Sequence, residues 1–250
     1  MAVITRARPR SHFHWTRLVI YAILILFALW FLMPVYVLLM ASLKSQTEAL
    51  QIQNMWLPPR ILGFRSFQIA WFGSNEPPAT LGLEQGFWNS VYLVIPATLI
   101  STAIGSINGY ILSKWKFRGA DLIFTLMLFG MFLPYQSILI PLVVTYQNFA
   151  RLTGIQLFST IPGLVVAHVI YGIPICTLIF RNYYAQLPTE MIEAARIDGA
   201  NFFSIYRRIL LPLSQPAFVV VVIWQFTSIW NDFLFGVTLA NTPKVYPITV

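Results

Sequence analysis

Residues 188–212 read PTEMIEAARIDGANFFSIYRRILLP, a polar stretch enclosed by two apolar runs, and this contrast decides the fold. Thr189, directly after a proline, is a suitable N-cap for a first short helix, and the acidic residues that follow suit the positive end of its dipole. Gly199 is a suitable C-terminal cap, and Asn201 can start a second helix. The sequence therefore predicts two short helices joined at a glycine and tied to apolar segments at both ends.

The second of these helices is expected over residues 202–211, and Pro212 is expected to end it. Arg207 and Arg208 lie in its last turns. Two helices outside a membrane, each connected to a membrane span, can transmit force between a cytoplasmic partner and the spans. The alternative is an amphipathic hairpin that lies on the inner leaflet.

Composition restricts the class of protein further. The chain has 250 residues, of which 58% are hydrophobic and only 10% charged. Soluble domains have roughly 25% charged residues, and a globule so poor in charge cannot cover its apolar side chains with a polar surface. The composition excludes a soluble domain, a disordered chain and a fibre, and predicts an all-α polytopic membrane protein. The single cysteine, Cys176, excludes an intrachain disulfide and a cysteine-based zinc site.

Five apolar stretches reach the roughly 20 residues that a helix needs to cross a bilayer. They cover residues 18–41, 88–112, 122–146, 161–180 and 217–240. The remaining parts are an N-terminal segment 1–17, a long loop 42–87, the segment 181–216 and a tail 241–250. The first stretch is too long for a signal-peptide core and is expected to be retained. The long loop, rich in proline and aromatic residues, is expected to be a small folded or membrane-lying element.

Basic residues are distributed unequally between the two predicted sides. One side carries Arg6, Arg8, Arg10, Arg17, Lys114, Lys116, Arg118, Arg181, Arg196, Arg207 and Arg208, and the other carries Lys44, Arg60, Arg65, Arg151 and Lys244. Because positive charge accumulates on the cytoplasmic side, the N-terminus is expected there, with odd-numbered spans running outward and even-numbered spans inward. This distribution explains the net charge of +8 without a nucleic-acid partner. Five spans leave the tail outside, so either the chain ends there or a sixth span is missing from this sequence.

The second predicted span carries a small residue at every fourth position. These residues are Ala97, Ser101, Gly105, Gly109 and Ser113. The spacing keeps them on one helix face, which a neighbouring helix can approach closely. The sequence therefore predicts intimate helix packing there, within the chain or with a partner chain.

Prolines are expected to interrupt most of the other spans, and polar side chains lie at similar depths. The prolines are Pro34, Pro134, Pro141, Pro162 and Pro174, and the candidate polar residues of a solute pathway are Gln136, His168, Tyr171, Gln225, Asn231 and Asp232. Polar groups in hydrocarbon indicate either a pathway or hydrogen bonds between helices, and both interpretations stay open. For His168 a packing role is favoured. For Asp232 a structural or gating role is favoured, for instance as the cap of a broken backbone.

The polar stretch resembles the EAA loop of ABC-importer membrane permeases. Glu193-Ala194-Ala195, three residues, Gly199, nine residues, Ile209, one residue and Leu211-Pro212 match both spacings, and Asp198 and Ala200 also agree. Together with the five spans, the long first external loop and Trp230-Asn231-Asp232, these residues look most like the sugar-type permeases of the maltose-permease second-subunit kind. The resemblance implies the type I importer transmembrane fold in a bacterial or archaeal cell (inner) membrane. Family members usually have a sixth span.

The resemblance also implies a mechanism. In this family the EAA loop couples to a separate ATPase subunit, and the residues carried over are Glu193, Ala194, Ala195, Asp198, Gly199, Ala200, Ile209, Leu211 and Pro212. The implied partners are a second homologous permease, two ATPase subunits and an extracytoplasmic solute-binding protein. ATP and Mg²⁺ would bind to the ATPase, and no cofactor is expected on this chain. The implied solute is a sugar or oligosaccharide, moved by alternating access.

Other classes find less support in the residues. The chain has no GxxxxGK[ST], HExxH or GxSxG motif, so ATP hydrolysis and the corresponding hydrolase chemistries are not expected of it. A self-sufficient secondary transporter or channel would need coupling-ion sites or repeated halves, and the sequence shows neither. An intramembrane enzyme would have only His168 and Asp232 as candidates, on spans that run in opposite directions.

Overall fold

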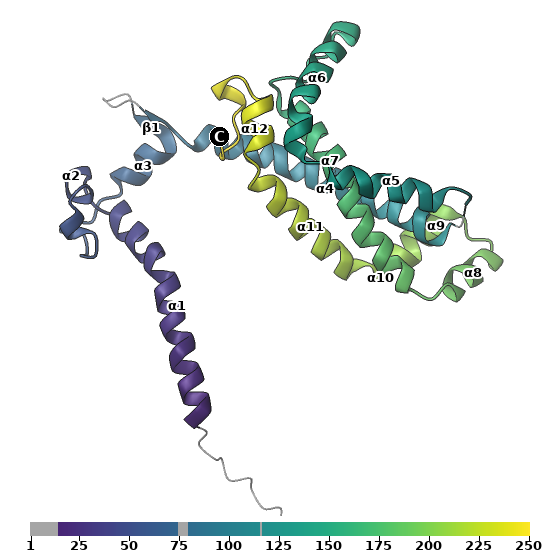
Figure 1. Ribbon diagram of the computed structural model, residues 1–250, viewed down its shortest axis with the longest axis horizontal. Coiled ribbons are helices and arrows are strands. Elements are labelled where there is room, and N and C mark those ends of the chain that lie inside the picture. Colours follow the sequence, from purple (N-terminus) through teal and green to yellow (C-terminus); the bar gives the residue numbers. More distant parts are fainter. Residues whose placement is uncertain (1–14, 75–79, 116) are drawn as a thin grey trace, which may run out of the picture. The chain divides into compact units, whose positions relative to one another are not determined.

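The computed structural model describes residues 15–74, 80–115 and 117–250, and these are mostly helical (Figure 1). The chain divides into two compact units, Met1–Leu81 and Gly82–Val250. Most of the predicted N-terminal segment 1–17, and Lys116 among the expected cytoplasmic cations, lie outside the described residues.

The first unit consists of one long apolar helix and a small folded segment. Helix α1 (Trp15–Ser42) includes the predicted span 18–41 and has no buried side chain. The segment after it contains α2 (Gln46–Ala49), η1 (Ile52–Asn54), α3 (Arg65–Phe72) and two short antiparallel strands, β1 (Gly73–Ser74) and β2 (Thr80–Leu81). Tyr36 Oη donates to the Trp56 carbonyl at 3.1 Å, and Lys44 Nζ donates to the Asn54 carbonyl. These bonds tie the folded segment to the end of α1.

The second unit is built around two long helices, α4 (Glu84–Lys114) and α7 (Ile161–Gln186) (Figure 1). A Cβ atom added at Gly105 would overlap Cys176 Cβ, and one added at Gly109 would lie 2.6 Å from Phe180 Cβ. Because these contacts advance together along both helices, α4 and α7 run parallel. The small residues at every fourth position of α4 therefore form the face that approaches α7. Ser101, which lies on this face, is fully buried.

The third predicted span, 122–146, is not one helix. It folds into α5 (Ala120–Phe132), the 3-10 turn η2 (Tyr135–Ile138) and α6 (Leu139–Thr153). The part from Tyr135 to Thr153 is bent from α5 by 92°. Leu133 has an extended backbone (φ −67°, ψ 127°), because the ring of Pro134 disfavours the helical conformation of the residue before it. Pro134 also lacks the amide hydrogen that would continue the helix.

The other prolines of the predicted spans lie within helices. Pro34 and Pro174 lie inside α1 and α7, and Pro162 lies in the first turn of α7. Pro141 lies in the first turn of α6, where an amide has no partner in the helix and its absence costs little. The expectation that prolines interrupt most spans is therefore wrong for these helices, and Pro134 alone of the five breaks one.

The fifth predicted span, 217–240, is also broken. It folds into α11 (Gln215–Trp230) and α12 (Leu234–Leu239). In the break, Asn231 Nδ2 donates to the Thr227 carbonyl at 2.8 Å, and the Asp232 carboxylate accepts from the Phe235 amide at 3.0 Å. Asp232 thus caps the first turn of α12, since its oxygen binds an amide that has no partner within the helix.

The predicted tail, 241–250, packs back onto the start of α4 and contains the 3-10 turn η4 (Pro243–Val245). Asn89 Nδ2 donates to the carbonyls of Lys244 and Tyr246 at 2.9 and 3.0 Å. Thr249 Oγ1 donates to the Asp232 carbonyl at 2.6 Å. The tail therefore fixes the broken end of the fifth span against α4.

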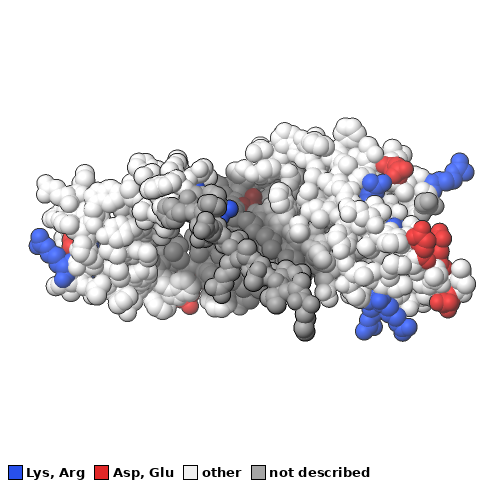
Figure 2. All heavy atoms as spheres, turned by 90° about the horizontal axis from the view of Figure 1, so that it is seen from below, with Lys and Arg blue, Asp and Glu red and all other residues white. Residues whose placement is uncertain are grey.

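Three of the described helices, α1, α4 and α7, are long and apolar enough to cross a membrane. Two bent pairs, α5 with the segment Tyr135–Thr153 and Phe202–Leu213 with α11, raise the number to five if each pair counts as one span. Figure 2 shows that much of the visible face carries no charged side chain. The helices thus present the apolar surface that a bilayer requires.

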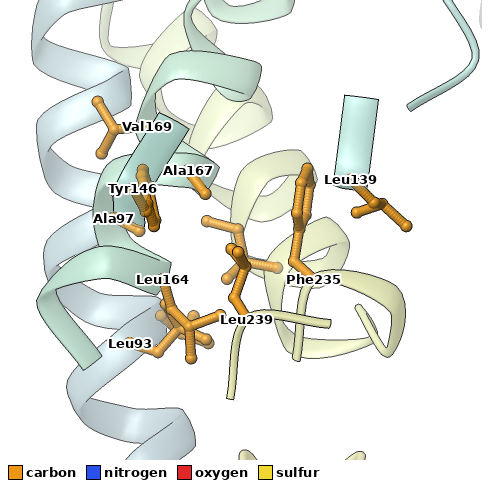
Figure 3. Close-up of a cluster of buried hydrophobic side chains, with 11 residues drawn as sticks. Leu93, Ala97, Leu139, Tyr146, Leu164, Ala167, Val169, Phe235 and Leu239 are labelled. Carbon is orange, nitrogen blue, oxygen red and sulfur yellow. The ribbon is translucent and has the colours of Figure 1, made fainter. Parts of the chain in front are cut away.

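Two clusters of buried apolar side chains fill the second unit. The first joins α4, α6, α7, α11 and α12 (Figure 3), and its members are Leu93, Val94, Ala97, Leu139, Tyr146, Leu164, Ala167, Val169, Ile229, Phe235 and Leu239. The second consists of Tyr110, Cys176, Phe180, Tyr184, Ile192, Ile205, Leu210, Ala217 and Val221. Since Ile192, Ile205 and Leu210 belong to the stretch 188–212, that stretch is part of the core and not an appendage.

Candidate functional site

The stretch 188–212 folds into two helical arms joined at a glycine. They are α8 (Glu190–Ile197) and the continuous arm formed by α9 (Phe202–Ile205), the π-helix η3 (Tyr206–Leu210) and α10 (Leu211–Leu213). At the elbow the Ala200 amide donates to the Ala195 carbonyl at 2.9 Å, and the Gly199 amide donates to the Arg196 carbonyl at 3.0 Å. This is a Schellman cap, and Gly199 has the left-handed φ of +82° that it requires.

One of the two predicted N-caps is correct. The Asn201 side chain accepts from the Ser204 amide at 2.9 Å and starts α9. Thr189 directly precedes α8 but makes no side-chain cap, so its predicted role is wrong. Its backbone is helical (φ −73°, ψ −27°), whereas an N-cap residue needs an extended backbone to direct its oxygen toward the first-turn amides.

The second arm does not end at Pro212 as the sequence predicts. It continues to Leu213 through the π-helix, in which the Leu211 amide donates to the Tyr206 carbonyl. Pro212 then lies in the first turn of α10, where the lack of an amide is tolerated. The arm bends by 78° into α11, and Ser214 is the single residue between the two.

Exposure separates the predicted coupling residues into two groups. The exposed ones are Glu193, Ala194, Asp198, Gly199, Leu211 and Pro212. The half-buried ones, which pack against the second cluster, are Ala195, Ala200 and Ile209. The half-buried group positions the arms, whereas the exposed group is available to a partner.

Two exposed apolar side chains of this surface are not among the predicted coupling residues. Ile197 is 86% exposed and Phe203 is 71% exposed, on either side of the Gly199 elbow. Both lie close in sequence to charged and polar residues, and Ile197 lies off the helix face that carries the buried Ile192. A large apolar residue outside the core face of a water-facing helix is the signal that would have found them, because such residues anchor protein interfaces.

A cavity of about 480 Å³ lies between the end of α4 and α8. Its lining residues are Ile111, Lys114, Trp115, Phe117, Thr189, Ile192, Glu193, Arg196 and Phe202. Lys114 Nζ donates to the Leu187 carbonyl at 2.6 Å, and the Arg196 guanidinium lies 4.7 Å from the centre of the Trp115 ring. Glu193 therefore shares the cavity with two cations of its own chain. Figure 2 shows that charged side chains gather at the end of the second unit that carries α8 (Figure 1).

Among the candidate pathway residues, the structure brings His168 and Asp232 together. His168 Nε2 lies 3.7 Å from Asp232 Oδ2, and the imidazole packs edge-on against the Phe235 ring at 5.1 Å. Tyr171 packs against Phe235 at 5.8 Å and against Tyr135 at 5.7 Å. The two ionisable residues and the aromatic rings thus form one group around Phe235.

The other candidates lie elsewhere. Gln225 is 3% exposed and occupies the space beside Gly172, where an added Cβ would overlap its amide. Its side chain therefore packs α11 against α7. Gln136 and Asn231 are exposed, and Asn231 is held by its bond to the backbone of α11. Within the described part of the chain, no three His, Cys, Asp or Glu residues lie close enough to hold a metal ion.

Comparisons with known proteins agree with this architecture. The chain is 37% identical over 233 residues to the xylose/arabinose import permease protein XacI of Haloferax volcanii, a match that covers 88% of this chain and 73% of XacI. It is 27% identical over 244 residues to the arabinooligosaccharides transport system permease protein AraQ of Bacillus subtilis, covering 97% and 82%. Among solved structures, a bacterial ABC transporter involved in the import of the acidic polysaccharide alginate matches with a TM-score of 0.77 and 21% identity, over 98% of this chain and 80% of that one.

This structural match shows that the fold is that of an ABC importer's type I transmembrane subunit. The sequence model of one family, described as the binding-protein-dependent transport system inner membrane component, matches residues 101–249. That range contains both helical arms, the Gly199 elbow and α11. The chain therefore belongs to the family of inner membrane components of binding-protein-dependent transport systems.

Proposed function

We propose that this chain is the membrane permease of an ABC importer that takes up a sugar or oligosaccharide, and that the Gly199 elbow is its contact with a separate ATPase. The observation that carries the proposal is the pair of exposed apolar side chains, Ile197 and Phe203, on a capped elbow whose two arms are anchored in the core. Because its arms are packed in the core, the elbow moves the spans when a partner moves it. A flexible loop would absorb the same displacement without moving the spans.

The exposed surface suits a protein partner better than a lipid surface. Ile197 and Phe203 project beside Asp198 and the small residues Ala194 and Gly199, which allow close approach. A hairpin lying on the inner leaflet would place basic residues beside its apolar face, to meet anionic headgroups. Arg207 and Arg208 would suit such headgroups, but the exposed acids of the first arm, Glu193 and Asp198, would be repelled by them. We infer that this surface enters a groove of the ATPase, with Glu193 at its edge.

The remaining parts of the proposal follow from the family. ATP and Mg²⁺ bind to the ATPase and not to this chain, two ATPase subunits and a second permease complete the complex, and a binding protein delivers the solute from outside. The N-terminus and the elbow lie in the cytoplasm, in agreement with the distribution of Lys and Arg. The names of XacI and AraQ support a sugar. The exposed Gln136 and the half-buried rings of Tyr135 and Tyr171 offer it a polar and an aromatic surface.

The test is purification of the tagged chain from its native membrane, with and without Ile197→Asp. We expect the unchanged chain to bring an ATPase subunit and a second permease with it. A charge at the centre of the contact should lower the recovery of the ATPase by about tenfold or more, as for a hot-spot residue, while the second permease is retained. Glu190→Lys, on the first turn of the same helix and also exposed, is the matched control and should have no such effect.

Two results would contradict the proposal. One is a purified chain that moves sugar across vesicles without ATP, as a secondary transporter would. The other is recovery of the ATPase that Ile197→Asp leaves unchanged.

A further inference from the structure

A chain of buried hydroxyl groups joins the second arm to three other helices. Ser106 Oγ on α4 lies 2.7 Å from the Tyr184 hydroxyl on α7 and 2.9 Å from the Tyr206 hydroxyl on the π-helix. The Tyr184 hydroxyl donates to Ser214 Oγ at 3.3 Å, and Ser214 Oγ donates to the Leu210 carbonyl at 2.7 Å. The chain thus runs from the first residue of the π-helix to its last, by way of α4, α7 and the bend before α11.

The donors of this chain have one consistent direction. Because Tyr184 gives its single proton to Ser214, it must accept from Ser106, and Ser106 must in turn accept from Tyr206. Each hydroxyl then gives one hydrogen bond and receives at most one. Ser106, Tyr184 and Ser214 are fully buried, so a hydroxyl without its partner would keep the cost of desolvation without compensation.

The surroundings hold Tyr206 in the chain. The ring of Tyr110 on α4 stacks on Tyr206 at 6.0 Å and on Phe202 at 4.8 Å. Helix α4 therefore contacts the start of the second arm through these aromatic rings as well as through Ser106. Tyr206 begins a π-helix, an irregularity that proteins keep mostly at functional positions. Arg207 and Arg208, the next two residues, are exposed, whereas the Tyr206 hydroxyl points inward to Ser106.

An apolar joint would have been sufficient for stability. The second cluster already buries Tyr110, Phe180, Ile205 and Leu210 around this point, and a Phe at either tyrosine position would fill nearly the same space. Directional hydrogen bonds add what apolar packing lacks, namely one preferred register between the arm and the helices. A joint with one register transmits a displacement, whereas an apolar joint allows the arm to slide.

We propose that Tyr206, Ser106, Tyr184 and Ser214 form a mechanical joint that transmits movement of the elbow to α4, α7 and α11. This inference rests on the proposed function, because the elbow moves only if an ATPase moves it. The four residues act as positioning residues and contact neither the ATPase nor the solute. Substitution of these residues should therefore leave ATP hydrolysis intact and weaken the response of the spans.

The experiment uses the complete importer in lipid vesicles, with MgATP inside and the cognate binding protein, purified with its natural ligand, outside. Basal ATP hydrolysis reports assembly, and its stimulation by the binding protein reports a signal that crosses the spans. For Tyr206→Phe and Ser106→Ala we expect basal hydrolysis within about twofold of the unchanged importer and a stimulation reduced by about tenfold, a coupling change of ordinary size. The double variant should be no worse than Ser106→Ala alone, since that change already removes the bond to Tyr206 as well as the bond to Tyr184.

Tyr183→Phe is the matched control. Tyr183 is the neighbour of Tyr184, and its hydroxyl donates to the Leu213 carbonyl at 2.8 Å, outside the buried chain. Tyr183→Phe should leave the stimulation of ATP hydrolysis within about twofold of that of the unchanged importer, which is much less than the loss of about tenfold expected for the joint variants. The proposal is overturned if Tyr206→Phe keeps full stimulation, or if Tyr183→Phe loses as much of it. Absence of any ATP hydrolysis with the unchanged chain would instead overturn the proposed function.

Discussion

Nε2 of His168 on α7 lies 3.7 Å from Oδ2 of Asp232 in the break between α11 and α12. The same carboxylate oxygen accepts the Phe235 amide at 3.0 Å, and the Phe235 ring packs against the imidazole. His168 is 6% exposed, and its Nε2 has no hydrogen-bond partner among the residues that the structure describes. Asp232 therefore has two neighbours in one place, an amide that it caps and an imidazole that it faces.

The cap predicts a difference between two substitutions of Asp232. Asp232→Ala removes the acceptor and should lower the free energy of unfolding by about 1 kcal/mol, as for other N-caps. This corresponds to a fall in Tm of roughly 2–4 °C for a chain of this size, measured by thermal unfolding of the purified complex. Asp232→Asn keeps an oxygen for the Phe235 amide and should lose less than half as much.

Asp121→Ala is the control for this comparison. The Asp121 side chain is 92% exposed and pairs with Arg181 at 3.0 Å, a surface ion pair that contributes little. It should leave the Tm unchanged. Equal losses for the Ala and Asn variants of Asp232 would show that the carboxylate charge, and not the cap, stabilises the break.

Two glycines of α4 should not tolerate a methyl group. A Cβ at Gly109 would lie 2.6 Å from Phe180 Cβ and 2.8 Å from the Arg181 amide nitrogen, and one at Gly105 would overlap Cys176 Cβ. Since backbone cannot move aside as a flexible side chain does, Gly105→Ala and Gly109→Ala should each cost about 1–3 kcal/mol of stability. The measurement is the yield of monodisperse protein together with its Tm.

Gly130→Ala provides the matched control on α5, where none of the residues described by the structure lies within 4 Å of the added Cβ. The better helix propensity of alanine should leave this variant as stable as the unchanged chain or slightly more so. A loss for Gly130→Ala equal to that for Gly109→Ala would mean that the close approach of α4 and α7 is not the cause.

The small-residue face was visible in the sequence because helical periodicity alone places Gly105 and Gly109 on one side. The breaks in the predicted spans were harder to predict from the sequence, because Pro134 and Pro174 look alike there and only one of them ends a helix. The contact between His168 and Asp232 could not be predicted, since it depends on α7 and α11 running antiparallel at one particular register. The exposure of Ile197 could have been predicted, because it lies off the helix face that carries the buried Ile192.

The left-handed conformation of Gly199 predicts how far the elbow accepts other residues. Its φ is +82°, and no atom of the described chain lies within 4 Å of an added Cβ, so the cost of a substitution is backbone strain and not collision. Gly199→Ala should cost about 1–2 kcal/mol of local stability, and Gly199→Asn less, because asparagine tolerates this conformation better. Hydrogen exchange of the α8 amides should rise in the same order.

The effect of this strain on coupling has its own control. Gly154, with φ +76° and equally open space, caps α6 at the opposite end of the second unit. Gly154→Ala introduces similar strain away from the elbow. We expect ATPase recovery to fall for Gly199→Ala and to stay constant for Gly154→Ala. A fall for both would assign the loss to general instability.

Reversal of charge at Glu193 should act within the chain before it acts on any partner. Glu193→Lys would place a third cation in the cavity that already holds Lys114 and Arg196, and the repulsion should displace Arg196 from the Trp115 ring. Recovery of the ATPase should therefore fall, whereas the exposed Glu190→Lys should have little effect. The double variant Glu193→Lys with Arg196→Glu restores one acid and two bases to the cavity, and recovery should return to within about threefold of the unchanged chain, the scale of a modest coupling energy. If the double variant recovers as little ATPase as the single one, the ATPase contacts the Glu193 carboxylate directly, and the position of Glu193 beside Lys114 does not explain the loss.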